Sequence, residues 1–121
     1  MGKQSAQTGR ESEDLAAIYL TGLGYELLAR NFRGAGGELD IVCQKGGVIY
    51  FVEVKARRRG TMVRPAEAVT PDKKRRLASC AEYWLYCHGK NTAACSFLLL
   101  TVEICPGEPS KIELVEDFLH W

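Results

Sequence analysis

The sequence predicts an α/β fold in which helices cover both faces of a central sheet of about five strands. Two segments show the periodicity of amphipathic helices, and five segments rich in β-branched and aromatic residues have the lengths of strands. The strand segments are largely apolar on both faces, which is typical of a sheet covered on both sides. With 121 residues, the chain is expected to form a single three-layer α/β/α domain over residues 1–121.

Residues 11–23 are predicted to form the first helix, which ends at Gly24. Thr8 and Glu11 have the spacing of a helix capping box and predict the start of this helix. The polar residues 1–7 lack the apolar segment of a secretory signal and are expected to be disordered.

Glu13 interrupts the apolar stripe of this first helix. It shares the stripe with three residues at helical spacing: Ala16, Ala17 and Leu20. A carboxylate in such a place either reaches out at the helix end or points into a functional site. The helical pattern alone leaves both possibilities open.

Residues 25–30 are predicted to form the first strand, and a glycine-rich loop is expected over residues 31–37. The loop is not a phosphate loop of the Walker type, because it has no Gly-Lys-Ser/Thr ending and leads into a strand. It suits a sharp turn or a close approach of the backbone to a ligand. Arg33 within it either contacts phosphate or is solvated.

Two strand segments, residues 39–44 and 48–56, flank the pair Gly46-Gly47. A diglycine linker between such segments predicts a hairpin with a two-residue turn, because both glycines can adopt positive φ. This turn sets the register of the hairpin, in which the numbers of opposed residues sum to 93.

This register brings two carboxylates face to face in an apolar hairpin. Asp40 is expected to lie opposite Glu53, and Glu38 opposite Lys55. Opposed like charges are destabilising unless a cation lies between them, and two carboxylates make a partial shell for Mg²⁺. Lys55 would then lie beside the attacking water or a substrate phosphate. The alternative is that Lys55 only neutralises the acids at the end of a sheet.

The positive charge of the chain is concentrated directly after this acidic pair. The net charge of +1 says nothing about nucleic acid, but residues 53–76 carry nine Lys or Arg and only three acids. A polyanion would approach there, although a solvated loop and helix face would look the same. Residues 58–65 show no periodicity and are expected to form a mobile loop.

A second helix is predicted from the residue after Thr70 to about His88. Thr70 suits the N-cap, and Pro71 suits the first helical position. Lys73 lies one turn before Leu77 on the apolar stripe of this helix, so it is expected to face the body of the protein.

Residues 96–104 and 111–115 are predicted to form two further strands. The five cysteines form no Cys-x-x-Cys pair, and with only two histidines no zinc spacing occurs. Cysteines used in this way are typical of a reducing compartment, so the protein is expected in the cytoplasm. No segment has the length that a membrane span requires.

Three motifs of the chain resemble the YraN-like family of predicted endonucleases. They are Gly37-Glu38-Leu39-Asp40, Phe51-Val52-Glu53-Val54-Lys55-Ala56-Arg57 and Thr70-Pro71-Asp72-Lys73. That family is related to archaeal Holliday-junction resolvases and belongs to the PD-(D/E)xK nuclease superfamily. The resemblance covers about residues 8–85 and implies a restriction-endonuclease-like fold with a mixed sheet. It implies a metal-dependent endonuclease that acts on DNA, with branched or junction DNA among the expected substrates.

The resemblance also implies roles for the acidic pair and its neighbours. Asp40 and Glu53 would hold Mg²⁺ or Mn²⁺, together with the backbone carbonyl of Val54. Lys55 would orient or deprotonate the attacking water. Glu13, which matches a helix glutamate of the family, would act through water or at a second metal position.

Four basic residues are candidates for binding the DNA backbone. Arg57 and Lys73 match basic positions of the family, whereas Arg33 and Arg58 are candidates by their place in the chain alone. A homodimer would supply the two cuts that a DNA junction requires.

The chain departs from the family pattern at two places. Ser12 stands where the family has glycine, and residues 96–98 read Ser-Phe-Leu where it has Arg-Phe-Asp. Two other function classes therefore stay open. One is a non-catalytic nucleic-acid-binding module on a nuclease scaffold. The other is a protein-interaction domain with a buried ion cluster, which would bind neither metal nor DNA.

Overall fold

The helices and strands follow the predicted α/β order. The computed structural model describes residues 2–58 and 70–116. Along the chain, the elements are α1 (Gly2–Gly22), β1 (Glu26–Gly34), β2 (Gly37–Lys45), β3 (Val48–Arg58), α2 (Pro71–Cys87), β4 (Cys95–Ile104) and β5 (Lys111–Glu116). The strands form one sheet in the order β1-β2-β3-β4-β5. β3 and β4 are parallel and the other neighbours antiparallel, so the sheet is mixed.

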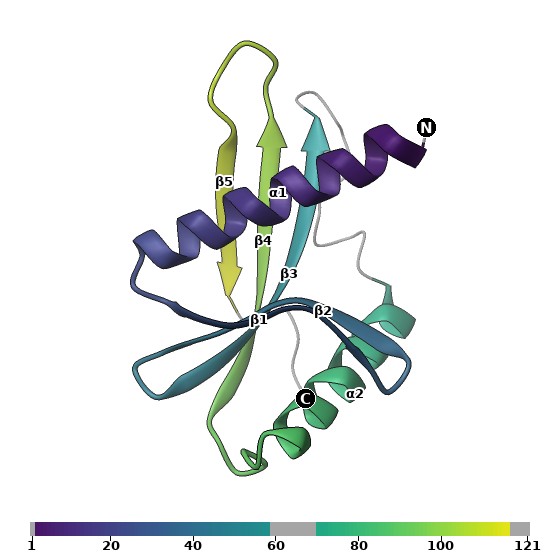
Figure 1. Cartoon of the computed structure of the whole chain (residues 1–121), viewed down its shortest axis with the longest axis vertical. Helices are drawn as coiled ribbons and strands as arrows, with labels where there is room; N and C mark the ends of the chain where they lie inside the picture. The colour runs from purple at the N-terminus through teal and green to yellow at the C-terminus, as the bar shows by residue number, and fades with distance from the viewer. Residues whose placement is uncertain (1, 59–69, 117–121) are drawn as a thin grey trace.

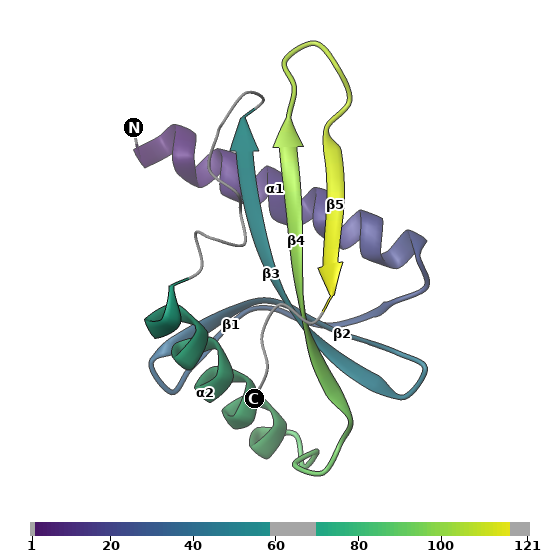
Figure 2. The same ribbon diagram turned by 180° about the vertical axis from the view of Figure 1, so that it is seen from behind.

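The two helices lie on opposite faces of this sheet (Figures 1 and 2). The face toward α2 is built around buried residues that include Val42, Phe51, Leu77, Trp84 and Phe97. The face toward α1 is built around Ala16, Leu20, Ile41, Val52 and Leu100. The predicted three-layer α/β/α class is confirmed, and the arrangement is consistent with a restriction-endonuclease-like fold.

β2 and β3 form the predicted hairpin. Its turn residues Gly46 and Gly47 have φ angles of 59° and 80°, both positive, as a type I′ turn requires. The strands are paired in the predicted register from the turn to the pair Ile41–Val52. The local glycine signal was therefore sufficient to align the two strands.

The first helix is longer than predicted. α1 begins at Gly2, so the predicted start at Thr8 is wrong. Lys, Gln and Ala in residues 2–7 have good helix propensity, which outweighs the local capping signal. The helix ends at Gly22, and Gly24 follows with a φ of 95°.

β1 runs through most of the segment that was predicted to be a loop. It continues to Gly34, and only Ala35 and Gly36, with φ angles of 50° and 77°, form the turn to β2. Gly37 lets this turn approach α2, because a Cβ atom there would lie 2.5 Å from the carbonyl oxygen of Arg76. The tip of the β1–β2 hairpin therefore packs directly against α2.

α2 begins and ends close to the predicted positions. The Thr70 hydroxyl accepts a hydrogen bond from the Lys73 N–H at 3.2 Å, and Pro71 is the first helical residue. His88 caps the other end.

The predicted mobile loop falls mostly outside the described residues. Arg58 ends β3, and residues 59–65 are not described. Among the residues that are described, no helix has both the length and the apolar character to cross a membrane.

Candidate functional site

Asp40 and Glu53 lie on the α2 side of the sheet. Both acids line a cavity together with residues of α2, and Glu53 follows Phe51, which packs toward α2, at the spacing of residues that share a strand face. Backbone pairing between β2 and β3 ends before Asp40. Instead, the Asp40 carboxylate accepts a hydrogen bond from the Val54 N–H at 2.8 Å. A side chain thus takes the place of a cross-strand carbonyl where the two strands separate.

The predicted opposition of Glu38 and Lys55 is wrong. Glu38 pairs with Arg33 of β1, and its carboxylate lies 3.7 Å from the Arg33 Nε. The reason is that β2 stays paired with β1 after its pairing with β3 has ended.

Two lysines converge on the buried Glu53 carboxylate. The Lys73 Nζ lies 2.7 Å from the Glu53 Oε1, and the Lys55 Nζ lies 3.6 Å from the same oxygen. The Glu53 side chain is only 5% exposed. A charge so deep in the protein is stable only when it is paired, and α2 and β3 each supply one partner.

The Asp40 carboxyl has its pKa raised from 3.8 to about 7. Burial is the largest cause, and the charge of Glu53 is the second. The hydrogen bond from the Val54 N–H lowers the pKa but does not outweigh them. Near neutral pH, a substantial fraction of the Asp40 carboxyl is therefore protonated.

The two lysines have pKa values shifted in opposite directions. Burial and the neighbouring Lys73 ammonium lower the pKa of Lys55. Burial also lowers the pKa of Lys73, but its hydrogen bonds to Glu53 and Lys55 and the nearby acids outweigh this and raise it. Lys55 is thus the amine that gives up its proton more readily.

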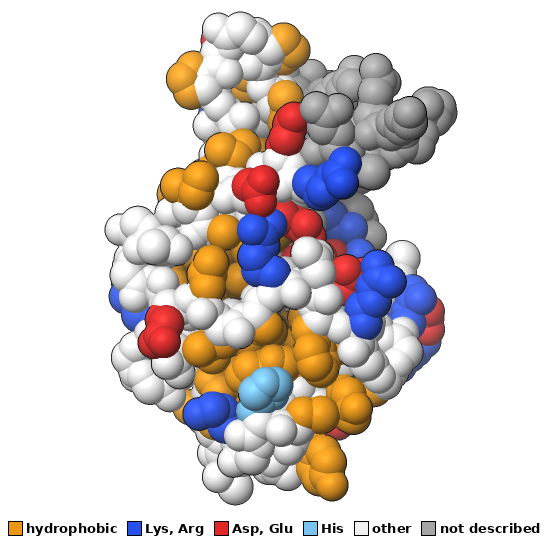
Figure 3. Space-filling model, viewed as in Figure 1, with side chains coloured by type: hydrophobic (Ala, Val, Ile, Leu, Met, Phe, Trp, Pro, Cys, Tyr) orange, Lys and Arg blue, Asp and Glu red, His pale blue; other side chains and the backbone are white. Residues whose placement is uncertain are grey.

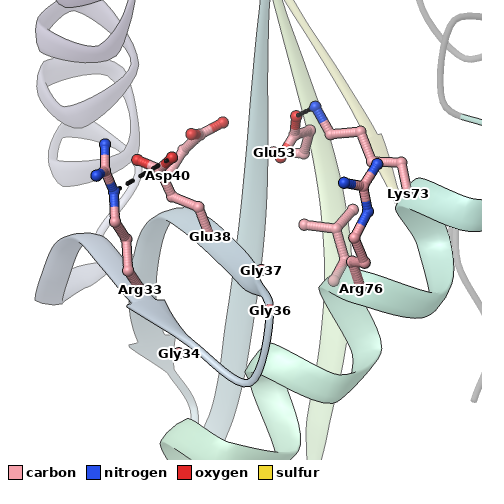
Figure 4. A pocket seen from close by; sticks show the side chains of 10 residues that line it. Arg33, Gly34, Gly36, Gly37, Glu38, Asp40, Glu53, Lys73 and Arg76 are labelled. Carbon is pink, nitrogen blue, oxygen red and sulfur yellow. Dashed lines mark ion pairs between the residues drawn. The ribbon is translucent and has the colours of Figure 1, made fainter.

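A cavity of about 520 Å³ opens over the acidic pair, between the β1–β2 hairpin and α2. Arg33 stands on the hairpin wall and Arg76 on the α2 wall, with Asp40 and Glu53 between them (Figure 4). Basic and acidic side chains gather in one zone of this face of the molecule (Figure 3). The floor of the cavity is therefore acidic, and its walls carry basic side chains, with Glu38 beside Arg33 on the hairpin wall.

Arg76 is a residue of this cavity that sequence analysis missed. It lies one turn beyond Lys73, and its guanidinium is 3.3 Å from the Asp72 carboxylate. The spacing of three residues from Lys73 was a signal, since residues three apart lie on one side of a helix. Its place in the wall also depends on the contact with Gly37, which no local pattern reveals.

Glu13 approaches the acidic pair from α1. Its charge contributes to the raised pKa of Asp40. The pKa of Glu13 is itself raised, chiefly by burial and against the attraction of Arg30, while Glu38 adds to the rise. Glu13 thus lies within electrostatic reach of Asp40 and Glu38, although it is not one of the residues that line the cavity.

The remaining basic candidates differ in their placement. Arg33 lines the cavity and is 79% exposed. Arg57 lies farther along β3, where its guanidinium is 4.0 Å from the Glu103 carboxylate, and it does not line the cavity. Arg58 belongs to the end of β3, and its side chain is outside the described part of the chain.

The acidic pair fits a hard divalent cation. Within the described residues, no group of three or more His, Cys, Asp or Glu side chains is arranged to hold a metal. Mg²⁺, however, commonly binds through one or two carboxylates and keeps several waters. The Val54 carbonyl points to the same side of β3 as its N–H, and therefore toward Asp40. Asp40, Glu53 and this carbonyl supply the oxygen atoms that such an ion prefers.

Comparison with known proteins identifies related sequences over almost the whole chain. The model of the family described as "Uncharacterised protein family UPF0102" matches residues 12–104. A UPF0102 protein of Symbiobacterium thermophilum is 40% identical over 96% of this chain and 98% of its own length. A UPF0102 protein of Dehalococcoides mccartyi is 38% identical over 98% of both chains. One from Streptomyces coelicolor is 51% identical over 67% of this chain and 63% of its own.

Proposed function

The chain belongs to the UPF0102 family, and we propose that it is a metal-dependent endonuclease that hydrolyses phosphodiester bonds in DNA. One observation carries the proposal: the Asp40 and Glu53 carboxylates lie on the floor of a cavity whose two walls carry Arg33 and Arg76, and Lys55 and Lys73 lie against Glu53. The motif resemblance to PD-(D/E)xK nucleases supports the same reaction.

Each residue of the floor has a role in this proposal. Asp40, Glu53 and the Val54 carbonyl would hold Mg²⁺ or Mn²⁺, which supplies charge neutralisation and an activated water when bound. Lys55 would orient the attacking water and, as the neutral amine that its lowered pKa favours, would accept a proton from it. Glu13, from α1, would act through water or at a second metal position.

The walls position the DNA strand. Arg33 and Arg76 face each other across the cavity, so that a strand lying between them places a phosphate above the acids. Lys73 offers a third cation from α2, and Arg57 lies farther along β3. Arg58 stays a candidate by its place in the chain alone. Such contacts hold the backbone without reading the base sequence.

The proposal also includes the DNA substrate, the oligomeric state and the cellular location. The resemblance supports branched or junction DNA as substrate and a homodimer as the active assembly. The five cysteines form no Cys-x-x-Cys pair, and this pattern supports a cytoplasmic location.

The proposal is tested by cleavage of labelled duplex, single-stranded and four-way DNA, and of duplex RNA, with Mg²⁺ or Mn²⁺. We expect wild type to cut DNA, and Glu53→Gln and Lys55→Met to lower the rate by about 100-fold or more while DNA binding changes little. Lys111→Gln, an exposed change on the edge strand β5, should cut like wild type.

The outcomes separate the function classes. A wild type that binds DNA but cuts no substrate identifies a binding module. Full activity in both variants refutes the assigned site. Absence of both metal and DNA binding leaves the protein-interaction class.

A further inference from the structure

Glu53 makes its shortest described ion pair with Lys73. The Lys73 Nζ and the Lys55 Nζ approach the same oxygen, Oε1, at 2.7 Å and 3.6 Å. Figure 4 shows Lys73 extending from α2 to this carboxylate. In the proposed function, the same carboxylate holds a divalent ion. An ammonium group of the protein and the ion therefore compete for one buried oxygen.

We infer that the Lys73 ammonium occupies the place beside the Glu53 carboxylate that the metal ion would take, until a substrate phosphate enters the cavity. Metal binding then depends on DNA. The inference rests on the proposed metal-dependent function. Lys73 lines the cavity from the first turn of α2, within reach of a phosphate held between Arg33 and Arg76. Its flexible stem allows the ammonium group to turn from Glu53 to the phosphate while the helix stays in place.

Electrostatic interactions favour the movement of the Lys73 ammonium from Glu53 to the phosphate when DNA and metal are both present. An ammonium ion beside Glu53 repels a divalent ion that approaches within a few ångströms, and the repulsion is stronger here than in bulk water. A phosphate gives Lys73 another anion with which it can form a charge-assisted hydrogen bond. The carboxylate is then released to the metal. By linkage, DNA must raise the metal affinity by the same factor as metal raises the DNA affinity.

The test measures Mn²⁺ binding by calorimetry, without any cleavage assay. We expect Lys73→Met to bind Mn²⁺ roughly tenfold more tightly than wild type when no DNA is present, within the usual range of such coupling. A short duplex with non-hydrolysable phosphorothioate linkages should tighten Mn²⁺ binding in wild type. The same duplex should tighten it much less in Lys73→Met.

Lys74→Met is the matched control. It removes the same charge from the same helical turn, but Lys74 neither lines the cavity nor contacts Glu53 in the described ion pairs. Its Mn²⁺ affinity should stay within about twofold of wild type, because a charge that does not contact Glu53 does not compete directly with the metal for its carboxylate. Thermal melts establish that each variant is folded.

The possible failures are distinguishable. If wild type and Lys73→Met bind Mn²⁺ equally well, or if DNA leaves the wild-type affinity unchanged, the role of Lys73 is refuted and the proposed function stands. If neither protein binds Mn²⁺ with or without DNA, the metal-dependent function fails together with the inference. Equal tightening in Lys74→Met would also refute the inference, since net charge alone would then explain it.

Discussion

The Asp40 carboxyl is expected to make the stability of the fold depend on pH. Its pKa is about 7 in the folded protein, because of burial and the charge of Glu53, and 3.8 is the ordinary value. Below about pH 4, the carboxyl is protonated in both the folded and the unfolded chain. As the pH rises toward 7, the unfolded chain releases this proton first, so the free energy of unfolding falls.

Asp40→Asn should remove this pH dependence, because the amide resembles the protonated acid and its oxygen can still accept the Val54 N–H. Urea unfolding in a chelating buffer should show similar stability for variant and wild type at pH 4. At pH 8 the variant should be more stable, by up to about 4 kcal/mol. Glu82→Gln, an exposed change on α2, controls for the loss of one acid. A stability difference that does not grow with pH would contradict the prediction.

At the scale of elements, the contact between the β1–β2 hairpin and α2 forms the wall of the cavity. Gly37→Ala would place a Cβ atom 2.5 Å from the Arg76 carbonyl oxygen and 3.2 Å from the Cys80 Cβ. Because the nearest atom is backbone, the hairpin must move away from α2. We expect a loss of about 1–3 kcal/mol in the free energy of unfolding, measured by urea denaturation.

Gly9→Ala is the matched control for this change. Gly9 lies in α1, and an added Cβ there would meet nothing within 4 Å. The control should therefore be neutral or more stable by up to about 1 kcal/mol. If Gly37→Ala and Gly9→Ala change the free energy of unfolding equally, the clash of the added Cβ with α2 does not explain the effect at Gly37.

The elements that were predictable from the sequence are those with a local signal. The diglycine turn aligned β2 with β3, and the Thr70-Pro71 pair located the start of α2. The end of pairing before Asp40 was not predictable, because it depends on β2 remaining with β1. Arg76 was missed for a related reason, since its neighbour Gly37 lies far away in the chain.

At the scale of the whole molecule, the basic cavity walls should make DNA binding depend on salt. Each phosphate that a cation contacts adds about 0.9 to the slope of log K against log salt concentration. Arg76→Gln should therefore reduce the magnitude of this slope by about 1 and weaken binding to all DNA sequences alike. Fluorescence anisotropy at several salt concentrations measures it.

Lys111→Gln is the control for the salt dependence. Lys111 is exposed on β5, at the far edge of the sheet from the β1–β2 hairpin. It should leave the slope unchanged. An equal decrease in both variants would mean that overall charge, and not the cavity, sets the affinity for DNA.

The hydrogen bond from the Val54 N–H to the Asp40 side chain has a consequence for mutagenesis at this position. Alanine at position 40 would delete an acid and also leave a main-chain donor of the neighbouring strand without its acceptor. An inactive alanine mutant would thus confound lost chemistry with a locally opened sheet. Asparagine can still accept the hydrogen bond from the Val54 N–H, so the two strands stay together. A defect of this isosteric variant can therefore be attributed to the missing charge.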